Sequence, residues 1–147
     1  MRIQTPYDED YGTCEYTHAW LRVMSETVDP DEVTSILGVA PSKVQRRGDS
    51  KKGKPGFWAK GGWFLSTEGV VSSKDARHHL DWILERLGGK RDAFMRLHER
   101  GYLIDLCVRW DSLSGHGGPT ISPNQMKVLA ELEIELWFDV YVGDLKA

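Results

Sequence analysis

The sequence predicts an α+β protein in which helices cover one face of a sheet. One observation is a motif that occurs twice: a helix-capping residue, a proline and, two residues later, an acid or amide. The other is that the strand-like segments alternate apolar and polar residues, which is typical of a sheet packed on one face only. The two copies of the motif are Val28-Asp29-Pro30-Asp31-Glu32-Val33 and Ile121-Ser122-Pro123-Asn124-Gln125-Met126.

Each motif follows one strand-like segment and precedes another, so the expected order is β-α-β, a long helix, and β-α-β again. We therefore expect a ferredoxin-like two-layer sandwich with a mainly antiparallel four-stranded sheet and an internal pseudo-twofold. These patterns leave the strand order open.

The first half begins with residues 16–24, whose strict alternation predicts a half-buried strand. Asp29 then caps a helix, and Gly38 supplies the residue that ends it. The charged segment 42–56 is expected to be a loop. Residues 57–67 are expected to form a second strand, which Gly61-Gly62 would bulge or bend.

The longest helical segment opens at Ser72 or Ser73. Apolar residues then recur at helical spacing, which predicts one buried face. Gly88-Gly89 is expected to break this helix before it resumes. The apolar residues concerned are Leu80, Ile83, Leu84 and Leu87, followed after the break by Phe94 and Leu97.

The second half opens with a strand at residues 102–110, and a glycine-rich loop at 112–120 leads to the second capped helix. Residues 134–142 form the clearest strand. We expect its even-numbered residues from Ile134 to Val142 to point toward the helices, and its odd-numbered residues to lie on the opposite face.

At 147 residues the chain has the length of one domain. We divide it into a loose lead-in at 1–15, one domain at 16–142 and a tail at 143–147. No segment approaches the roughly 20 apolar residues that span a bilayer, so we expect no membrane partner. The first residues lack the apolar stretch of a signal peptide, which indicates a cytoplasmic location.

Charge is unevenly distributed along the chain. Residues 43–60 hold seven cations and one acid, so this segment carries +6 and the rest −9, given the net charge of −3. Such a segment is more often a solvated loop than a docking site. The two cysteines, Cys14 and Cys107, are far apart and belong to no CxxC motif, so we expect free thiols.

The chain resembles a bacterial family known as domain of unknown function 4279, over about residues 16–142. That family has no assigned activity. Some of its members look like small immunity or inhibitor-type proteins of bacterial conflict systems, so the resemblance implies a bacterial protein that binds another protein. The loop at 46–56 is longer here than in the usual pattern. The resemblance rests on Val28-Asp29-Pro30-Asp31-Glu32-Val33, Leu37-Gly38-Val39-Ala40-Pro41, Arg47-Gly48-Asp49, Trp63-Phe64-Leu65-Ser66, Leu80-Asp81-Trp82-Ile83-Leu84, Ile121-Ser122-Pro123 and Phe138-Asp139-Val140-Tyr141.

The sheet face turned away from the helices is the main candidate site. Its aromatic rings and guanidinium groups have the composition of binding hot spots. The competing interpretations are a homodimer interface, or cover by the long helix or the lead-in, with the charges paired across strands. The residues expected there are Tyr16, His18, Trp20, Arg22, Asp105, Arg109, Glu135, Trp137, Asp139 and Tyr141.

Other chemistries find little support in the sequence. Nucleic acid is an unfavourable partner because this face carries three acids and the chain is acidic overall. The loop around His116 lacks the spacing of a phosphate-binding loop. The five histidines and two cysteines form no metal-binding or nucleophile motif. We therefore expect no catalytic residue, no metal and no cofactor.

The preferred hypothesis is a non-enzymatic binding protein, immunity-like or inhibitor-like, that holds a protein partner on this face. One alternative is a small-ligand or nucleotide-sensing domain that adds Arg46 and Arg47 to the same face. A second alternative is a structural homodimer through the aromatic face. The candidate binding residues are His18, Trp20, Arg22, Arg46, Arg47, Arg109, Trp137, Asp139 and Tyr141.

Overall fold

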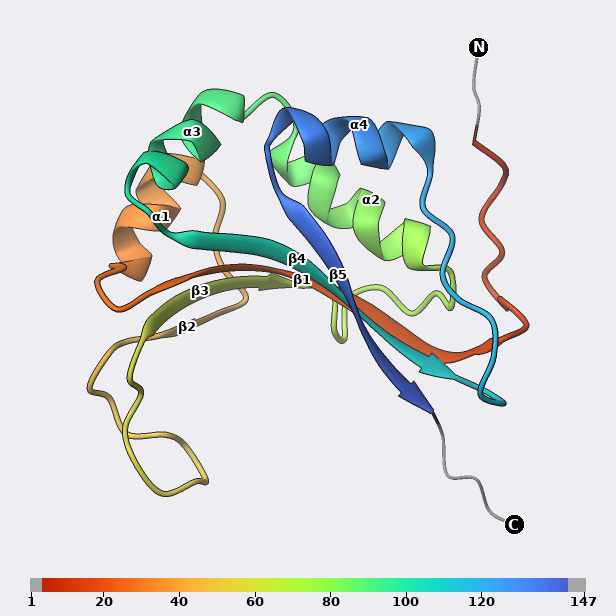
Figure 1. Ribbon diagram of the computed structural model, residues 1–147, viewed down its shortest axis with the longest axis horizontal. Coiled ribbons are helices and arrows are strands. Elements are labelled where there is room, and N and C mark those ends of the chain that lie inside the picture. Colours follow the sequence, from red (N-terminus) through yellow and green to blue (C-terminus); the bar gives the residue numbers. More distant parts are fainter. Residues whose placement is uncertain (1–3, 143–147) are drawn as a thin grey trace.

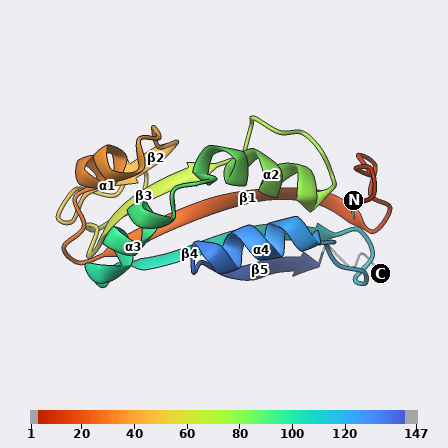
Figure 2. The same cartoon turned by 90° about the horizontal axis from the view of Figure 1, so that it is seen from above.

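The computed structural model describes residues 4–142, which form four helices on one face of a five-stranded sheet (Figure 1). Seen from above, α1 and α3 lie side by side over one end of the sheet, and α2 and α4 over the other (Figure 2). The α+β class with helices on one face is therefore confirmed. The elements are β1 (Cys14–Ser25), α1 (Pro30–Leu37), β2 (Lys43–Gln45), β3 (Gly61–Ser66), α2 (Ala76–Leu87), α3 (Arg91–Glu99), β4 (Leu103–Ser112), α4 (Pro123–Glu131) and β5 (Glu135–Val142).

The strand order is β2-β3-β1-β4-β5. β1 is central and antiparallel to both β3 and β4, β2 is antiparallel to β3, and β4 and β5 are parallel. The expected ferredoxin-like arrangement of four strands with a pseudo-twofold is not confirmed. The two halves differ because β1 and β3 are antiparallel neighbours, whereas β4 and β5 are parallel neighbours.

The helix starts follow the predicted capping residues. Asp29 accepts a hydrogen bond from the backbone of Asp31, and Ser122 forms a complete capping box with Gln125. α1 ends at Gly38 with φ of 67°, as the sequence indicates.

The start of α2 lies later than predicted. Its N-cap is Asp75, whereas Ser73 supports that cap by accepting a hydrogen bond from the Asp75 amide. The break after this helix is where it was expected, and Gly89 there has φ of 74°.

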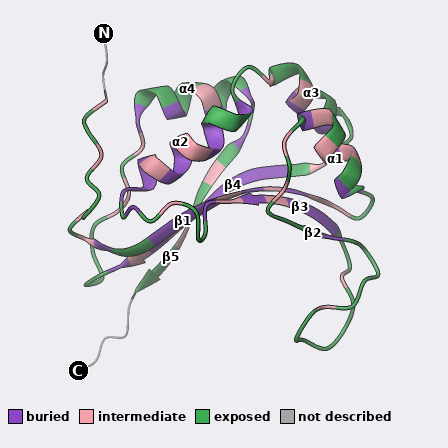
Figure 3. Ribbon diagram, turned by 180° about the vertical axis from the view of Figure 1, so that it is seen from behind, coloured by how far each residue is buried: buried purple, intermediate pink, exposed green. Residues whose placement is uncertain are grey.

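The core lies between the helices and the inner face of the sheet, as the buried stripes in Figure 3 show. Ala19, Leu21 and Val23 of β1 have no exposed surface and meet the buried side of the helices. The side chain of Trp63 on β3 is fully buried, and its indole donates a 3.0 Å hydrogen bond to Thr34 of α1. This bond satisfies the one polar group of a large core ring.

The predicted lead-in ends too late, because Cys14 and Glu15 already belong to β1. Its described residues 4–13 form no helix or strand, but they are tied to α2. The Arg77 guanidinium pairs with Asp75 at 2.7 Å and donates to the carbonyl oxygens of Thr5 and Pro6. The Asp8 amide donates to Asp75. Although burial raises the pKa of Asp75, the bonds from Arg77 and Asp8 outweigh it and hold that pKa below its usual value. The segment therefore lies on the helix side of the sheet.

A second polar connection joins the helices. The amide group of Gln125 on α4 donates to the Arg77 carbonyl at 2.9 Å and to the Asp81 carboxylate at 2.8 Å, both on α2. Gln125 is completely buried, so these bonds are shielded from water. The residue that completes the α4 capping box thus also fixes α4 against α2.

Two expectations about the sheet edges are wrong. Residues 42–56 are not all loop, because Lys43–Gln45 forms the short edge strand β2. The even-numbered side chains of β5 are not all core: Phe138, Val140 and Val142 are 42%, 55% and 53% exposed. β5 descends away from the helix layer along its length (Figure 1), and these three side chains stay exposed.

Among residues 4–142, no helix combines the length and apolar character needed to cross a membrane. Both cysteines are free and buried, as expected.

Gly61 marks the place where β3 passes closest to the chain before α1. A Cβ atom added there would lie 2.6 Å from the carbonyl oxygen of Val28 and 2.8 Å from its side chain. Gly61, the first residue of β3, is therefore needed for a close approach of this strand to Val28, and not for the bulge or bend that was predicted.

We predict that Gly61→Ala destabilises the protein by about 1–3 kcal/mol, because Val28 must move to admit the methyl group. Gly12→Ala is the matched control, since no atom lies within 4 Å of its added Cβ. Urea denaturation of both variants measures the difference. Equal stability of the two variants would contradict this packing.

Candidate functional site

The candidate site is the open face, which we define as the sheet surface opposite the four helices. The alternation of β1 puts Tyr16, His18, Trp20 and Arg22 on this face, as predicted. The described lead-in and all four helices lie on the other side (Figure 1), so the expected alternative in which they cover this face is wrong. Tyr16 and Trp137 are 39% and 37% exposed.

Arg22 is fixed by its neighbours on the open face. It lies opposite Asp105 in the β1–β4 pairing and donates two hydrogen bonds to that carboxylate, at 2.8 and 2.7 Å. Its guanidinium carbon lies 5.1 Å from the ring centroid of Trp137. The hydrogen bonds to Asp105 raise the pKa of Arg22, which stays charged. The pair therefore supports the Trp137 ring in one orientation.

A second arginine is held in the same way. Arg109 donates to Asp111 at 3.0 and 3.3 Å, and its guanidinium carbon lies 4.3 Å from the ring centroid of Tyr141. The Tyr141 hydroxyl in turn donates to Asp139 at 3.1 Å. Arg109 is thus paired within its own strand, whereas the cross-strand pairing that one alternative anticipated is found between Arg22 and Asp105.

His18 lies between two aromatic rings and is only 6% exposed. Its ring centroid is 5.4 Å from that of Tyr16 and 4.9 Å from that of Trp20, and its Nδ1 lies 2.7 Å from the Tyr16 hydroxyl. Burial lowers the pKa of His18 below its usual 6.5, so the imidazole is neutral at neutral pH, and a hydrogen bond joins its Nδ1 to the Tyr16 hydroxyl. The three residues form one rigid aromatic row.

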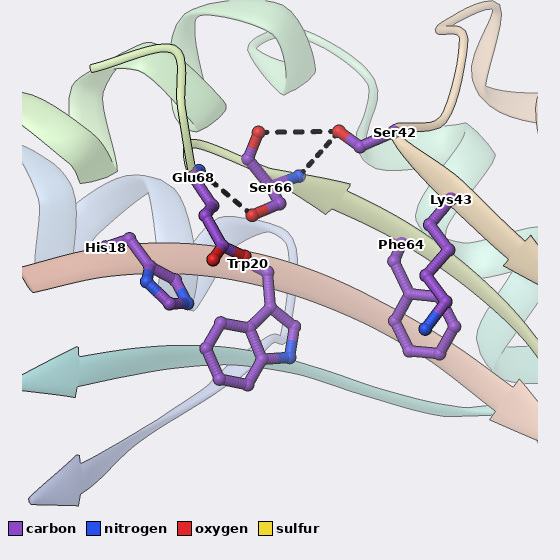
Figure 4. Close-up of a pocket in the computed structure, with 7 residues that line it drawn as sticks. All are labelled: His18, Trp20, Ser42, Lys43, Phe64, Ser66 and Glu68. Carbon is purple, nitrogen blue, oxygen red and sulfur yellow. Dashed lines mark hydrogen bonds between the residues drawn. The ribbon is translucent and has the colours of Figure 1, made fainter. Parts of the chain in front are cut away.

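A groove opens beside this row, toward β2 and β3 (Figure 4). It has a volume of about 480 Å³, within the usual range for ligand pockets. The Trp20 and Phe64 rings lie on its floor. Figure 4 shows the Glu68 carboxylate above Trp20 and the Lys43 ammonium beside Phe64. The lining residues are His18, Trp20, Ser42, Lys43, Phe64, Ser66 and Glu68.

The two charged groups of the groove have no ionic partner within residues 4–142. Neither the Lys43 ammonium nor the Glu68 carboxylate forms an ion pair with any residue in this range; Lys43 instead lies 5.9 Å from the ring centroid of Phe64 and 5.8 Å from that of Trp58. These charges remain free to meet a ligand or partner, unlike the paired arginines beside them.

Seven of the nine predicted binding residues meet on the open face. Arg46 does not, because it pairs with Asp29 and Asp31 at the N-terminus of α1, at 3.4 and 3.0 Å. Arg47 lies exposed in the loop between β2 and β3. The seven residues brought together are His18, Trp20, Arg22, Arg109, Trp137, Asp139 and Tyr141.

Local sequence patterns do not reveal the groove. Ser42 and Lys43 lie in the segment predicted to be a loop, and no local signal places β3 next to β1. Once β3 is known to pair with β1, the alternation of Phe64 and Ser66 with the buried Trp63 and Leu65 places these two residues on the open face.

Within residues 4–142, no cluster of three or more histidine, cysteine, aspartate or glutamate residues is arranged to hold a metal ion. Burial raises the pKa of the Cys107 thiol to about 12, so this residue on the open face is a packed thiol at neutral pH.

We predict that the free energy of unfolding falls as the pH is lowered from 6.5 to 5.5. The unfolded chain takes up protons on histidine near pH 6.5, whereas burial lowers the native pKa of both His18 and the core residue His79. His18→Gln keeps a side chain that can hydrogen-bond to Tyr16 and removes the His18 contribution to this pH dependence. In urea denaturation at both pH values, the free energy of unfolding of this variant should fall by less than that of the parent chain. An equal fall in both proteins would contradict the burial of a neutral His18.

A family model described as Domain of unknown function (DUF4279) matches residues 15–143 and so covers every described strand except Cys14, the first residue of β1. The comparison with curated proteins and the comparison with solved structures each found no match. The open face and the groove thus lie within the matched range, and the chain belongs to the family of the domain of unknown function DUF4279.

Proposed function

We propose that this protein binds a protein partner through the open face. The observation that carries the proposal is the rigid exposure of Trp137, Tyr141 and Tyr16 on an uncovered sheet, with each ring held near a paired arginine. Aromatic side chains with few free torsions lose little entropy on binding. Trp, Tyr and Arg are also the residues that most often dominate binding energy.

The chemistry of the face also indicates what the partner must offer. Arg22 and Arg109 already form ion pairs with Asp105 and Asp111. They therefore support the aromatic rings and do not require acidic groups on the partner. Lys43 and Glu68 lack ion pairs among the described residues, and an opposite charge near each would complement them. We infer a folded partner that places an apolar side chain over Trp20 and Phe64, in an immunity-like or inhibitor-like complex.

We predict that Trp20→Ala and Trp137→Ala each weaken capture of this partner by about 2 kcal/mol or more, roughly 30-fold in Kd. Trp137 is 37% exposed, so the thermal midpoint of Trp137→Ala should stay close to that of the parent chain.

Trp82→Ala is the matched control, because Trp82 lies half-buried on α2 under Arg86, away from the open face. Proteins that the immobilised parent chain retains from a bacterial lysate are identified, and each is then purified and titrated against the parent chain and the variants. The proposal fails if Trp82→Ala weakens binding as much as Trp137→Ala, or if neither open-face variant changes it.

A second candidate function, small-ligand sensing, is favoured by the groove alone. Its aromatic floor and its opposite charges fit a flat ligand that carries both a cationic and an anionic group, such as a free aromatic amino acid. A nucleotide would use the same floor and Lys43, but would meet repulsion from Glu68.

We predict that such a ligand raises the thermal midpoint, because at a hundredfold excess over Kd it stabilises the native state by about 2.7 kcal/mol. Lys43→Gln should abolish the shift, whereas Lys54→Gln in the exposed loop should retain it. No shift with amino acids, nucleotides or simple anions at millimolar concentration argues against this function.

A further inference from the structure

The two edges of the sheet are protected very differently. β2 at one edge has three residues, begins with Lys43 and is followed by Arg46 and Arg47. β5 at the other edge has eight residues and contains no lysine, arginine or proline. Proteins usually shield a long edge strand with such residues, because its free backbone groups otherwise pair with another strand.

β5 also exposes apolar side chains on both of its faces. Trp137 and Tyr141 lie on the open face, whereas Phe138, Val140 and Val142 point to the helix side and are 42–55% exposed. β5 descends away from the helix layer (Figure 1), in agreement with the exposure of these three residues. An unprotected backbone edge therefore coincides with an uncovered apolar row.

We propose that β5 pairs in antiparallel register with β5 of a second copy of this chain, around a twofold axis perpendicular to the sheet at Phe138. The axis keeps the helices of both copies on the same side, so residues that meet across the interface come from the same face. This proposal concerns the edge of the sheet and does not depend on the function proposed for the open face.

The register follows from the charges of the strand. If most of β5 pairs with its copy, the twofold axis can pass either at residue 138 or at residue 139. A centre at residue 139 would put Asp139 directly opposite its own copy, which is destabilising. A centre at residue 138 puts Trp137 opposite Asp139 and Tyr141 opposite Glu135, so no acid faces an acid.

The same register joins the apolar side chains. On the helix side Phe138 meets its own copy, and Leu136 meets Val140 on either side of it. Asp139 keeps the hydrogen bond from Tyr141 within its own chain. The strand is thus complementary to itself, which is what a twofold interface needs and what favours a second copy over an unrelated strand.

The dimer leaves the open face free. The sheets of the two copies become continuous, and both grooves remain accessible on one surface. This differs from the homodimer given as an alternative in the sequence analysis, in which the aromatic face itself is the interface and would be buried.

Cross-linking tests the register. Residues opposite each other in an antiparallel pair have Cα atoms about 4.5–5.5 Å apart, within the roughly 4.4–6.8 Å range of disulfides. Phe138→Cys should therefore form a disulfide-linked dimer on mild oxidation, reversed by a reductant. Val44→Cys on β2 is the matched control, since Val44 is 38% exposed on the other edge.

The oligomeric state tests the interface itself. Analytical ultracentrifugation of the full chain should give twice the mass of one chain, and Phe138→Lys should raise the dimer dissociation constant at least tenfold while Val44→Lys leaves it unchanged. A monomer at all concentrations overturns the proposal. So does equal cross-linking at positions 44 and 138, or a dimer that Trp20→Ala disrupts and Phe138→Lys does not.

Discussion

The division of the β1 side chains between the two faces of the sheet is the constraint on which the rest of the structure depends. Ala19, Leu21 and Val23 are fully buried under the helices, so their neighbours must lie on the other face. A shift of one residue would turn the whole apolar set outward. On the open face, the ion pair of Arg22 with Asp105 holds this register. On the inner side, the Thr67 hydroxyl accepts a hydrogen bond from the Ala19 amide.

This constraint also explains why the open face is rigid. β1 is central, so its side chains have neighbours on both β3 and β4. Arg22 of β1 finds Asp105 on the neighbouring β4, and Arg109 of β4 finds Asp111 on its own strand, so the rings of Trp137 and Tyr141 rest near guanidinium groups that are each held by a carboxylate. A face ordered before binding loses less entropy when a partner arrives. In the groove, the charges of Lys43 and Glu68 are not ion-paired within the described residues.

Local patterns in the sequence were sufficient for the elements and for most of the site. The caps at Asp29 and Ser122 and the alternation of residues 16–24 depend on neighbours within a few residues, and these predictions are confirmed. The strand order and the groove depend on contacts between distant segments, which no local pattern encodes. β2 was missed because three residues are too short to show alternation.

The errors at β5 have a similar cause. Alternation correctly places Phe138, Val140 and Val142 on the helix side, but burial also requires a helix close enough to cover them. β5 descends away from α4 along its length (Figure 1), and these three side chains stay exposed. Arg46 is one of the predicted binding residues, whereas the fold brings it to Asp29 and Asp31, two acids at the start of α1. In both cases the residue pattern was interpreted correctly and the tertiary neighbour was unknown.

The central claim is that binding takes place on the open face, and the tryptophan indole signals in an NMR titration test it most directly. The chain holds six tryptophans, spread over both sides of the sheet. With the captured partner added to labelled protein, we expect the indole N–H signals of Trp20 and Trp137 to shift, while those of the buried Trp63 and Trp110 stay in place. A shift confined to Trp82 on α2, with Trp20 and Trp137 unchanged, would contradict the account.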